Sequence, residues 1–204
     1  GSIFGLFLGY YIVSSLTDAV FFLLLCMGQL HTLADYFTLN LSSPNTPGLR
    51  QLQHGDELSK LLEQVMETQQ RLASAGVVTP VLLKVAPDLT DEDIDQIAQQ
   101  VVRHKLDGLI ATNTTLDRRA VQGHPLSEQA GGLSGAPLTE VSCGVVRKFR
   151  ERLPQGLPII GVGGIGSIQD AQNMLNAGAD LLQIYSSFIY QGSNLVRSLT
   201  RSVH

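Results

Sequence analysis

Amide and hydroxyl side chains gather in the segment Asn40-Leu41-Ser42-Ser43-Pro44-Asn45-Thr46, which holds two amides, three hydroxyls and a proline. The segment directly follows the apolar run Tyr36–Leu39, which has the character of a β-strand. Amides and hydroxyls can bind a polar substrate, and α/β proteins place substrate sites where their strands end. The segment therefore predicts a substrate site. The alternative is an ordinary turn, because Ser, Pro and Asn are also common turn residues.

A phosphate site is indicated by the glycine-rich segment Gly161–Gly166, which follows the apolar strand Pro158–Ile160. Glycines let backbone N–H groups close on an anion, and the start of the next helix adds a partial positive charge. Gly131–Gly135 offers a second close backbone approach, and Tyr185-Ser186 ends the last predicted strand. The dinucleotide fingerprint G-x-G-x-x-G fits poorly, so we expect the phosphate of a mononucleotide cofactor.

Lys84 lies inside the apolar, strand-like segment Val81–Ala86. A charged ammonium is costly in a dry core, so Lys84 must face a wet, anionic centre or extend to solvent. The alternative is a strand lysine without a functional role. Thr112–Thr115 forms another polar strand end that can donate and accept hydrogen bonds. No Ser/His/Asp or Cys/His arrangement is evident, and no paired carboxylates stand at the predicted strand ends, which disfavours hydrolysis by those routes.

The composition is that of a globular protein, with 44% hydrophobic and 16% charged residues in a chain of 204. The net charge is −4, and Lys and Arg do not cluster, which disfavours a nucleic-acid partner. Cys26 and Cys143 show neither metal-ligand spacing nor a disulfide framework. We therefore expect no metal site.

From residue 36 onward, apolar strand-like segments alternate with amphipathic helical segments. The predicted strands are Tyr36–Leu41, Pro80–Val85, Asp107–Thr112, Pro158–Val162 and Asp180–Tyr185, and the predicted helices are Asp56–Ala75, one capped by Thr90, about Leu138–Leu153, Ile168–Ala177 and one near the C-terminus. Such alternation predicts an α/β protein with a parallel sheet. Polar residues end every strand, which favours a TIM (β/α)8 barrel over an open doubly wound sheet. The barrel would be incomplete, with about six of eight β/α units and its first strands missing.

Residues 1–30 contain no Lys or Arg and a single charge, Asp18. Asp18 divides this apolar stretch into pieces shorter than the ~20 residues that a spanning helix needs. Basic residues that would orient a span are absent. We therefore favour a buried strand, Ile3–Gly9, and a buried helix from about Asp18 to His31 over a membrane span.

Taken together, the motifs resemble those of dihydroorotate dehydrogenases. The resemblance covers residues 31–204 and rests on Asn40–Arg50, Lys84–Leu89, Ala111–Thr115, Gly131–Gly135, Gly161–Gly164 and Gln183–Ser186. With serine at position 43, the segment resembles the membrane-associated, quinone-reducing class of the family, because the soluble class has cysteine at this position. The segment Val102–Arg118 resembles proteobacterial members.

The resemblance implies that dihydroorotate is oxidised to orotate in de novo pyrimidine (UMP) biosynthesis, with FMN as hydride acceptor and quinone as final electron acceptor. Ser43 would be the catalytic base that removes the C5 proton of the substrate. The implied cofactor-binding residues are Asn40, Lys84, Thr112, Ser134, Gly135, Gly163, Gly164, Tyr185 and Ser186. The implied substrate-binding residues are Asn40, Asn45, Asn113 and Thr114.

The resemblance also implies a single FMN-binding barrel domain over residues 1–204, in which residues 1–30 diverge. Phe7, for example, stands where the family has an FMN-contacting Asn. Peripheral association with the cytoplasmic side of the bacterial inner membrane would come from family N-terminal helices that are absent here. With strands missing, we expect this chain itself to be inactive or weakly active. The alternatives are another FMN- or phosphate-binding barrel oxidoreductase, or a non-catalytic membrane-associated fragment.

Overall fold

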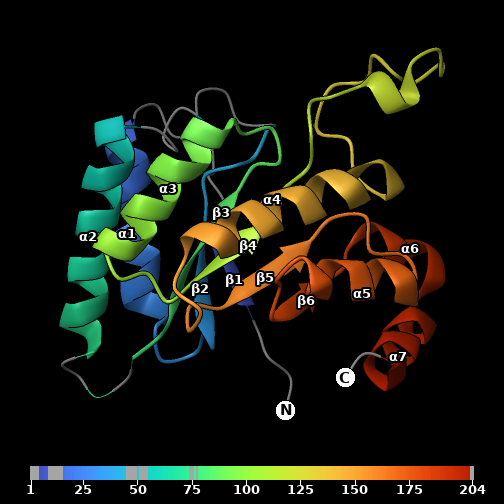
Figure 1. Ribbon diagram of the computed structural model, residues 1–204. Coiled ribbons are helices and arrows are strands. Elements are labelled where there is room, and N and C mark those ends of the chain that lie inside the picture. The colour runs from blue at the N-terminus through green and yellow to red at the C-terminus, as the bar shows by residue number, and fades with distance from the viewer. Residues whose placement is uncertain are drawn as a thin grey trace.

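A sheet of six parallel strands forms the centre of the molecule (Figure 1). The computed structural model describes residues 5–8, 16–44, 50, 55–73, 76 and 78–202. The strands are β1 (Gly5–Leu8), β2 (Tyr36–Asn40), β3 (Val81–Val85), β4 (Gly108–Ala111), β5 (Ile159–Val162) and β6 (Leu181–Gln183). They pair in strictly sequential order. A barrel wall has this order, whereas a doubly wound sheet reverses it at a switch point. The predicted incomplete barrel is therefore confirmed.

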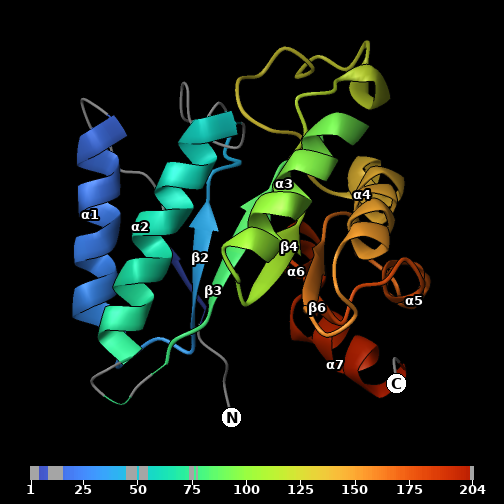
Figure 2. The same ribbon diagram turned by 60° about the vertical axis from the view of Figure 1, so that its left-hand side comes forward.

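Helices line one face of the sheet. They are α1 (Leu16–Leu30), α2 (Gly55–Ala73), α3 (Asp91–Arg103), α4 (Thr139–Arg152), α5 (Ile168–Asn176) and α7 (Ser193–Ser202), and Figure 2 shows α1, α2 and α3 side by side. The short helix α6 (Ser186–Gln191) buries no residue in this layer and packs against α7. Successive strand residues point to opposite faces. In β3, Val81, Leu83 and Val85 join the main core with the helices, whereas Leu82 joins a small cluster made of strand residues only. That second face is the barrel interior.

The strand register brings polar residues to one edge of the sheet. Asn40 at the end of β2 pairs with Lys84 of β3. Val85 pairs with Ala111, the residue before Thr112. Because all the strands run in the same direction, their carboxyl ends meet at a common edge, where the loops after them can combine into one site.

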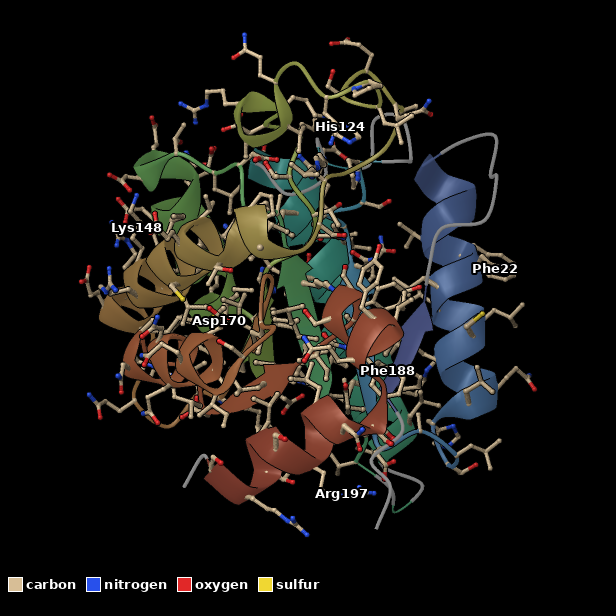
Figure 3. The ribbon with its side chains drawn as sticks, turned by 90° about the vertical axis from the view of Figure 1, so that its right-hand side faces the viewer. Phe22, His124, Lys148, Asp170, Phe188 and Arg197 are labelled. Carbon is tan, nitrogen blue, oxygen red and sulfur yellow. The ribbon has the colours of Figure 1, made fainter. Side chains whose placement is uncertain are left out.

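Helix α1 is only partly buried. The strand and the helix predicted for the first 30 residues are both present as β1 and α1, but the predicted burial of the helix is wrong. Phe21 is 69% exposed and Leu25 is 48% exposed. In Figure 3 the side chain of Phe22 points away from the body of the molecule. The physical reason is that α1 lies at the edge of the helical layer and packs chiefly against α2, and no other helix or strand that the structure describes covers its opposite face.

In the part of the chain that the structure describes, no helix combines the length and the apolar character that crossing a membrane requires.

Local details refine the predicted elements. The predicted Thr90 cap before α3 is confirmed, since Asp93 N donates to Thr90 Oγ1 at 3.2 Å. Thr90 N donates in return to the Asp93 carboxylate at 2.9 Å, which completes a capping box. The single helix predicted at the C-terminus is wrong: it is divided into α6 and α7 at Gly192, whose φ is +61°. The loop after β4 contains the short 3-10 helices Arg119–Val121 and Ala136–Leu138, which the sequence pattern did not reveal.

Phe149 in α4 provides a test of the main core. Its side chain is 0% exposed, and replacing a buried Phe with Ala removes apolar contacts and leaves a cavity. We expect Phe149→Ala to lower the free energy of unfolding by about 3–5 kcal/mol. Urea unfolding followed by circular dichroism would measure this change.

Phe21→Ala is the matched control, because the same truncation on the exposed face of α1 should change the free energy of unfolding by about 0.5 kcal/mol or less. Equal losses in the two variants would contradict the arrangement of α1 and α4 described above.

Candidate functional site

A cavity of about 340 Å³ opens at the carboxyl edge of the sheet. This volume falls within the usual range for small-ligand sites, about 300–1,000 Å³. Its lining includes ten residues predicted for a site, namely Lys84, Thr112, Asn113, Thr114, Ser134, Gly135, Gly163, Gly164, Tyr185 and Ser186. They come from the ends of β3, β4, β5 and β6 and from the loop between β4 and α4. Segments far apart in the sequence thus contribute to one cavity.

A hydrogen-bond network joins the ends of β2 and β4 beside this cavity. Asn113 Nδ2 donates to Asn40 Oδ1 at 3.0 Å and contacts Ser42 Oγ at 3.1 Å. Ser42 Oγ in turn donates to Asn40 Oδ1 at 3.0 Å. Asn40 does not itself line the cavity, but the network connects it to Asn113, which does. The structure therefore brings together the side chains of Asn40 and Asn113, two of the amide residues predicted for the site.

Ser43 follows the buried Ser42 directly and is itself half-buried. It lies three residues after the end of β2, at the same edge of the sheet as the cavity, while the cavity lining does not include it. Its predicted role as a base stays a prediction. Asn45, the remaining predicted substrate-binding residue, lies outside the described residues.

Gly163 and Gly164, which follow β5, form a part of the cavity wall that consists of backbone atoms. Gly163 and Gly164 have φ values of +124° and +73°, which favour glycine. A Cβ atom on Gly163 would lie 2.3 Å from Ser142 Oγ, and one on Gly164 would lie 2.2 Å from Thr139 Oγ1. Thr139 Oγ1 also donates to the Gly164 carbonyl at 2.9 Å, which holds the turn against the start of α4. Only backbone atoms of these two residues can therefore face the cavity.

The loop after β4 returns to the cavity through a short antiparallel bridge. Thr115 N donates to Leu133 O at 3.1 Å, and Leu133 N donates to Thr115 O at 2.8 Å. The bridge places Ser134 at the cavity, where Ser186 Oγ donates to Ser134 Oγ at 2.8 Å. The predicted contribution of these two hydroxyls to a common site is consistent with this contact.

Lys84 supplies positive charge to the cavity from the middle of the apolar β3. Burial lowers its pKa from 10.5 to about 8, because removal from water disfavours the charged form. The side chain is therefore still predominantly cationic at pH 7. Together with the neighbouring hydroxyls and backbone groups, it makes the cavity suited to a polar ligand that carries negative charge.

Several residues of the cavity were not predicted individually. Gln183 is the most informative, because its Oε1 atom is buried and has no hydrogen-bond partner among the described residues. A buried acceptor of this kind normally finds a partner, so a ligand with an N–H or O–H group would satisfy it. The sequence did carry a signal for this residue, because Gln183 is a polar residue within the last predicted strand and begins the Gln183–Ser186 segment that resembles the family. The other unpredicted lining residues are Leu138, Val162, Ile165, Ile184 and Ser187.

Comparisons with family models, curated proteins and solved structures all match this chain to dihydroorotate dehydrogenases. A family model described as dihydroorotate dehydrogenase matches residues 17–204. The protein named dihydroorotate dehydrogenase (quinone) from Aliivibrio salmonicida is 50% identical over 181 residues, which cover 88% of this chain and 54% of that protein. The protein of the same name from Chromobacterium violaceum is 48% identical over 201 residues, covering 98% of this chain and 58% of that protein. This chain spans about half the length of the curated relatives that it matches.

The fold also has a solved counterpart. The crystal structure of DHODH from Eimeria tenella in complex with ferulenol superposes on this chain with a TM-score of 0.83 at 32% identity. The superposition covers 89% of this chain and 52% of the other. The resemblance seen in residues 31–204 therefore extends to the arrangement of the strands and helices.

Lys84 provides a test of the electrostatics of the cavity. We expect its ammonium group to titrate with a midpoint near pH 8 in the ligand-free protein, because burial lowers its pKa from the ordinary value of 10.5. The measurement is an NMR pH titration of protein whose lysines carry ¹³C-methyl groups, with the Lys84 signal assigned by its loss in Lys84→Arg. A midpoint near 10.5 would show that the side chain lies in water rather than in the cavity wall.

Proposed function

This chain belongs to the dihydroorotate dehydrogenase family, and on that premise we propose that it forms one FMN-binding barrel domain whose site oxidises dihydroorotate to orotate. The step belongs to de novo pyrimidine biosynthesis. Enzymes of this family use FMN as their cofactor. The observation that carries the proposal is the convergence of Lys84, the Gly163–Gly164 turn and the Asn40–Asn113 network at one edge of the sheet.

The cavity residues fit a flavin mononucleotide. The turn at Gly163 and Gly164 presents only backbone to the cavity, an arrangement that lets backbone N–H groups approach a phosphate closely. Ser134 and Ser186 add hydroxyl groups that can bond phosphate or ribityl oxygens. The buried Gln183 acceptor can take a hydrogen bond from a ligand hydroxyl or N–H. FMN, when bound, supplies the hydride acceptor. Thr112, Gly135 and Tyr185 complete the wall that we assign to it.

Lys84 contributes a cation where negative charge develops during the reaction. Its partial burial strengthens the effect, since charges interact more strongly away from bulk water. The pKa of about 8 means that the cation is retained through neutral pH and is lost as the pH rises above that value. Activity that depends on this charge should therefore decline on the alkaline side.

Substrate binding is assigned to the amide network. Asn40, Asn113 and Thr114 offer the donors and acceptors that a planar molecule with amide and carboxylate groups needs, and Asn45 is the fourth assigned residue. Ser43 would accept the proton from C5 of dihydroorotate while the hydride leaves C6. A serine hydroxyl alone is a weak base, so its surroundings must favour proton transfer. The half-buried position of Ser43 beside the Asn40–Ser42–Asn113 network supports this role.

Quinone is the proposed final electron acceptor, and the support is the name carried by the bacterial relatives. With it we propose peripheral association with the cytoplasmic side of the bacterial inner membrane, as part of the complete protein. The 204-residue chain should turn over weakly. Tyr185, which lines the cavity, is 77% exposed, so water has access to the site and weakens the electrostatic interactions within it.

The first experiment is an anaerobic visible spectrum of the protein reconstituted with FMN, before and after addition of dihydroorotate. We expect bound flavin to bleach. Ser43→Ala should bind flavin normally but bleach at least about 100-fold more slowly, because a positioned base contributes about 10²–10⁴ to such a rate. Ser198→Ala, a matched change on the exposed face of α7, should bleach at the wild-type rate.

Three results would contradict parts of this proposal. Absence of bound flavin would reject the cofactor assignment for this chain. Bound flavin that dihydroorotate leaves oxidised, but that another reductant bleaches, would favour the alternative of a different FMN-dependent barrel oxidoreductase. Reoxidation of the reduced protein by fumarate or NAD⁺, but not by a short-chain ubiquinone, would reject quinone as the acceptor.

Gly164→Ala tests the phosphate end of the cavity. The added Cβ would meet Thr139 Oγ1 at 2.2 Å and Thr139 N at 2.5 Å, and φ at this position is +73°. The turn must shift, so we expect FMN to bind at least about tenfold more weakly, a loss of about 1.4 kcal/mol. Titration of FMN fluorescence measures the affinity. Gly144→Ala is the control, because no described atom beyond its own turn of α4 would lie within 4 Å of the added Cβ. Equal affinity in both variants would place the phosphate elsewhere.

A further inference from the structure

The Arg50 guanidinium joins the loops that follow three neighbouring strands. Its Nε donates to the Ser42 carbonyl at 3.1 Å, after β2. Its Nη2 donates to the Thr114 carbonyl at 2.9 Å, after β4. Its Nη1 forms an ion pair with Asp88 Oδ2 at 2.9 Å, after β3. One side chain therefore fixes the relative positions of three segments of the site.

Asp88 extends this connection. Its carboxylate also accepts hydrogen bonds from Thr115 Oγ1 and, at 3.0 Å, from Leu116 N. Both groups belong to the same loop as Thr114. We call Arg50, Asp88 and these contacts the Arg50–Asp88 bridge. The ion pair is largely shielded, with side-chain exposures of 21% and 29%, and neither residue lines the cavity. The bridge lies behind the cavity wall and can act on a ligand only through the loops that it holds.

Ser42 is held from two sides, and this fixes its neighbour. Arg50 binds its carbonyl, while Asn40 and Asn113 bind its hydroxyl. The Ser42 carbonyl and the Ser43 N–H belong to one planar peptide unit. Orienting the carbonyl therefore sets the orientation of the Ser43 backbone and limits where the Ser43 hydroxyl can point.

We propose that Arg50 is a positioning residue for Ser43, held in place by Asp88. The proposal rests on the function proposed above, which assigns proton transfer to Ser43. The arrangement needs an arginine, because three acceptors in three directions match the planar guanidinium fork and not the single ammonium of lysine. A displacement of about 1 Å in a reacting group can cost about 100-fold in rate.

The first test needs no activity. Amide hydrogen exchange, followed by mass spectrometry, is compared between the wild-type protein and Arg50→Lys. We expect peptides covering residues 36–44 and 112–116 to exchange at least about tenfold faster in the variant, which corresponds to about 1.4 kcal/mol of lost local stability. Asp88→Asn keeps the shape of its side chain and removes the charge, so it should produce the same pattern. If Arg50→Lys does not fold, the exchange pattern of Asp88→Asn alone shows whether the bridge holds these loops.

Arg150→Lys is the matched control. Arg150 makes the same kind of contacts at the opposite edge of the sheet, to the Gly178 carbonyl at 3.0 Å, the Leu157 carbonyl at 3.1 Å and Asp180 Oδ2 at 2.6 Å. Its replacement should speed exchange near residues 157–159 and 178–181 and leave residues 36–44 unchanged.

The second test links the bridge to Ser43. In the FMN-loaded protein, Arg50→Lys should slow flavin reduction by dihydroorotate at least tenfold at unchanged flavin content, while Arg150→Lys should not. If Arg50 acts through Ser43, the same change in a Ser43→Ala background should cost nothing further. If Arg50 contributed only to the general structure, Arg50→Lys would slow flavin reduction by the same factor with Ser43 present and with Ser43→Ala.

The outcomes separate this proposal from the proposed function. Wild-type exchange at residues 36–44 and 112–116 in both Arg50→Lys and Asp88→Asn overturns the bridge. An equal loss of flavin reduction with and without Ser43 overturns its action through Ser43. Bound flavin that dihydroorotate never bleaches in the wild-type protein defeats the proposed function instead, and the exchange comparison then decides the bridge alone.

Discussion

Parallel hydrogen bonding between sequential strands is the constraint on which the rest of the molecule depends. It directs the carboxyl ends of all six strands to one edge, so that side chains far apart in the sequence meet there. Asn40 and Asn113 are 73 residues apart, yet their side chains are joined by a hydrogen bond. The loops do not need to create this proximity. They only have to refine it, through short-range contacts such as the Thr115–Leu133 bridge.

The alternation of side chains along each strand separates stability from chemistry. In β3, Leu83 and Val85 pack against the helices, while Lys84 between them faces the barrel interior. The two faces meet different demands: one must exclude water, and the other must hold a polar ligand. The charge of Lys84 therefore lies in the barrel interior and not in the main core, although partial burial there still lowers its pKa. The same division explains why the interior cluster contains strand residues alone.

Much of this arrangement could be predicted from the sequence, because periodicity and polar strand ends are local signals. The segments around Lys84, Asn113 and Gly163 were assigned to the site from such signals, and the structure brings them together. Properties that depend on neighbours could not be predicted in this way. The exposure of Phe21 depends on what packs beside α1, and the three partners of Arg50 come from loops whose meeting only the sheet defines.

The loop between β4 and α4 stands out from the body of the molecule in Figure 1. Its base is closed by the Thr115–Leu133 bridge, and Gly132 packs there so closely that a Cβ would lie 1.8 Å from Thr114 Oγ1. The base is therefore held by its own backbone contacts, and nearer the tip Arg118 joins the two sides of the loop by donating to the carbonyls of Gln129 and Gly131. Surface loops that are closed at the base usually tolerate changes in length at the tip, so residues 120–128 are where an inserted peptide would least disturb Thr114 and Ser134.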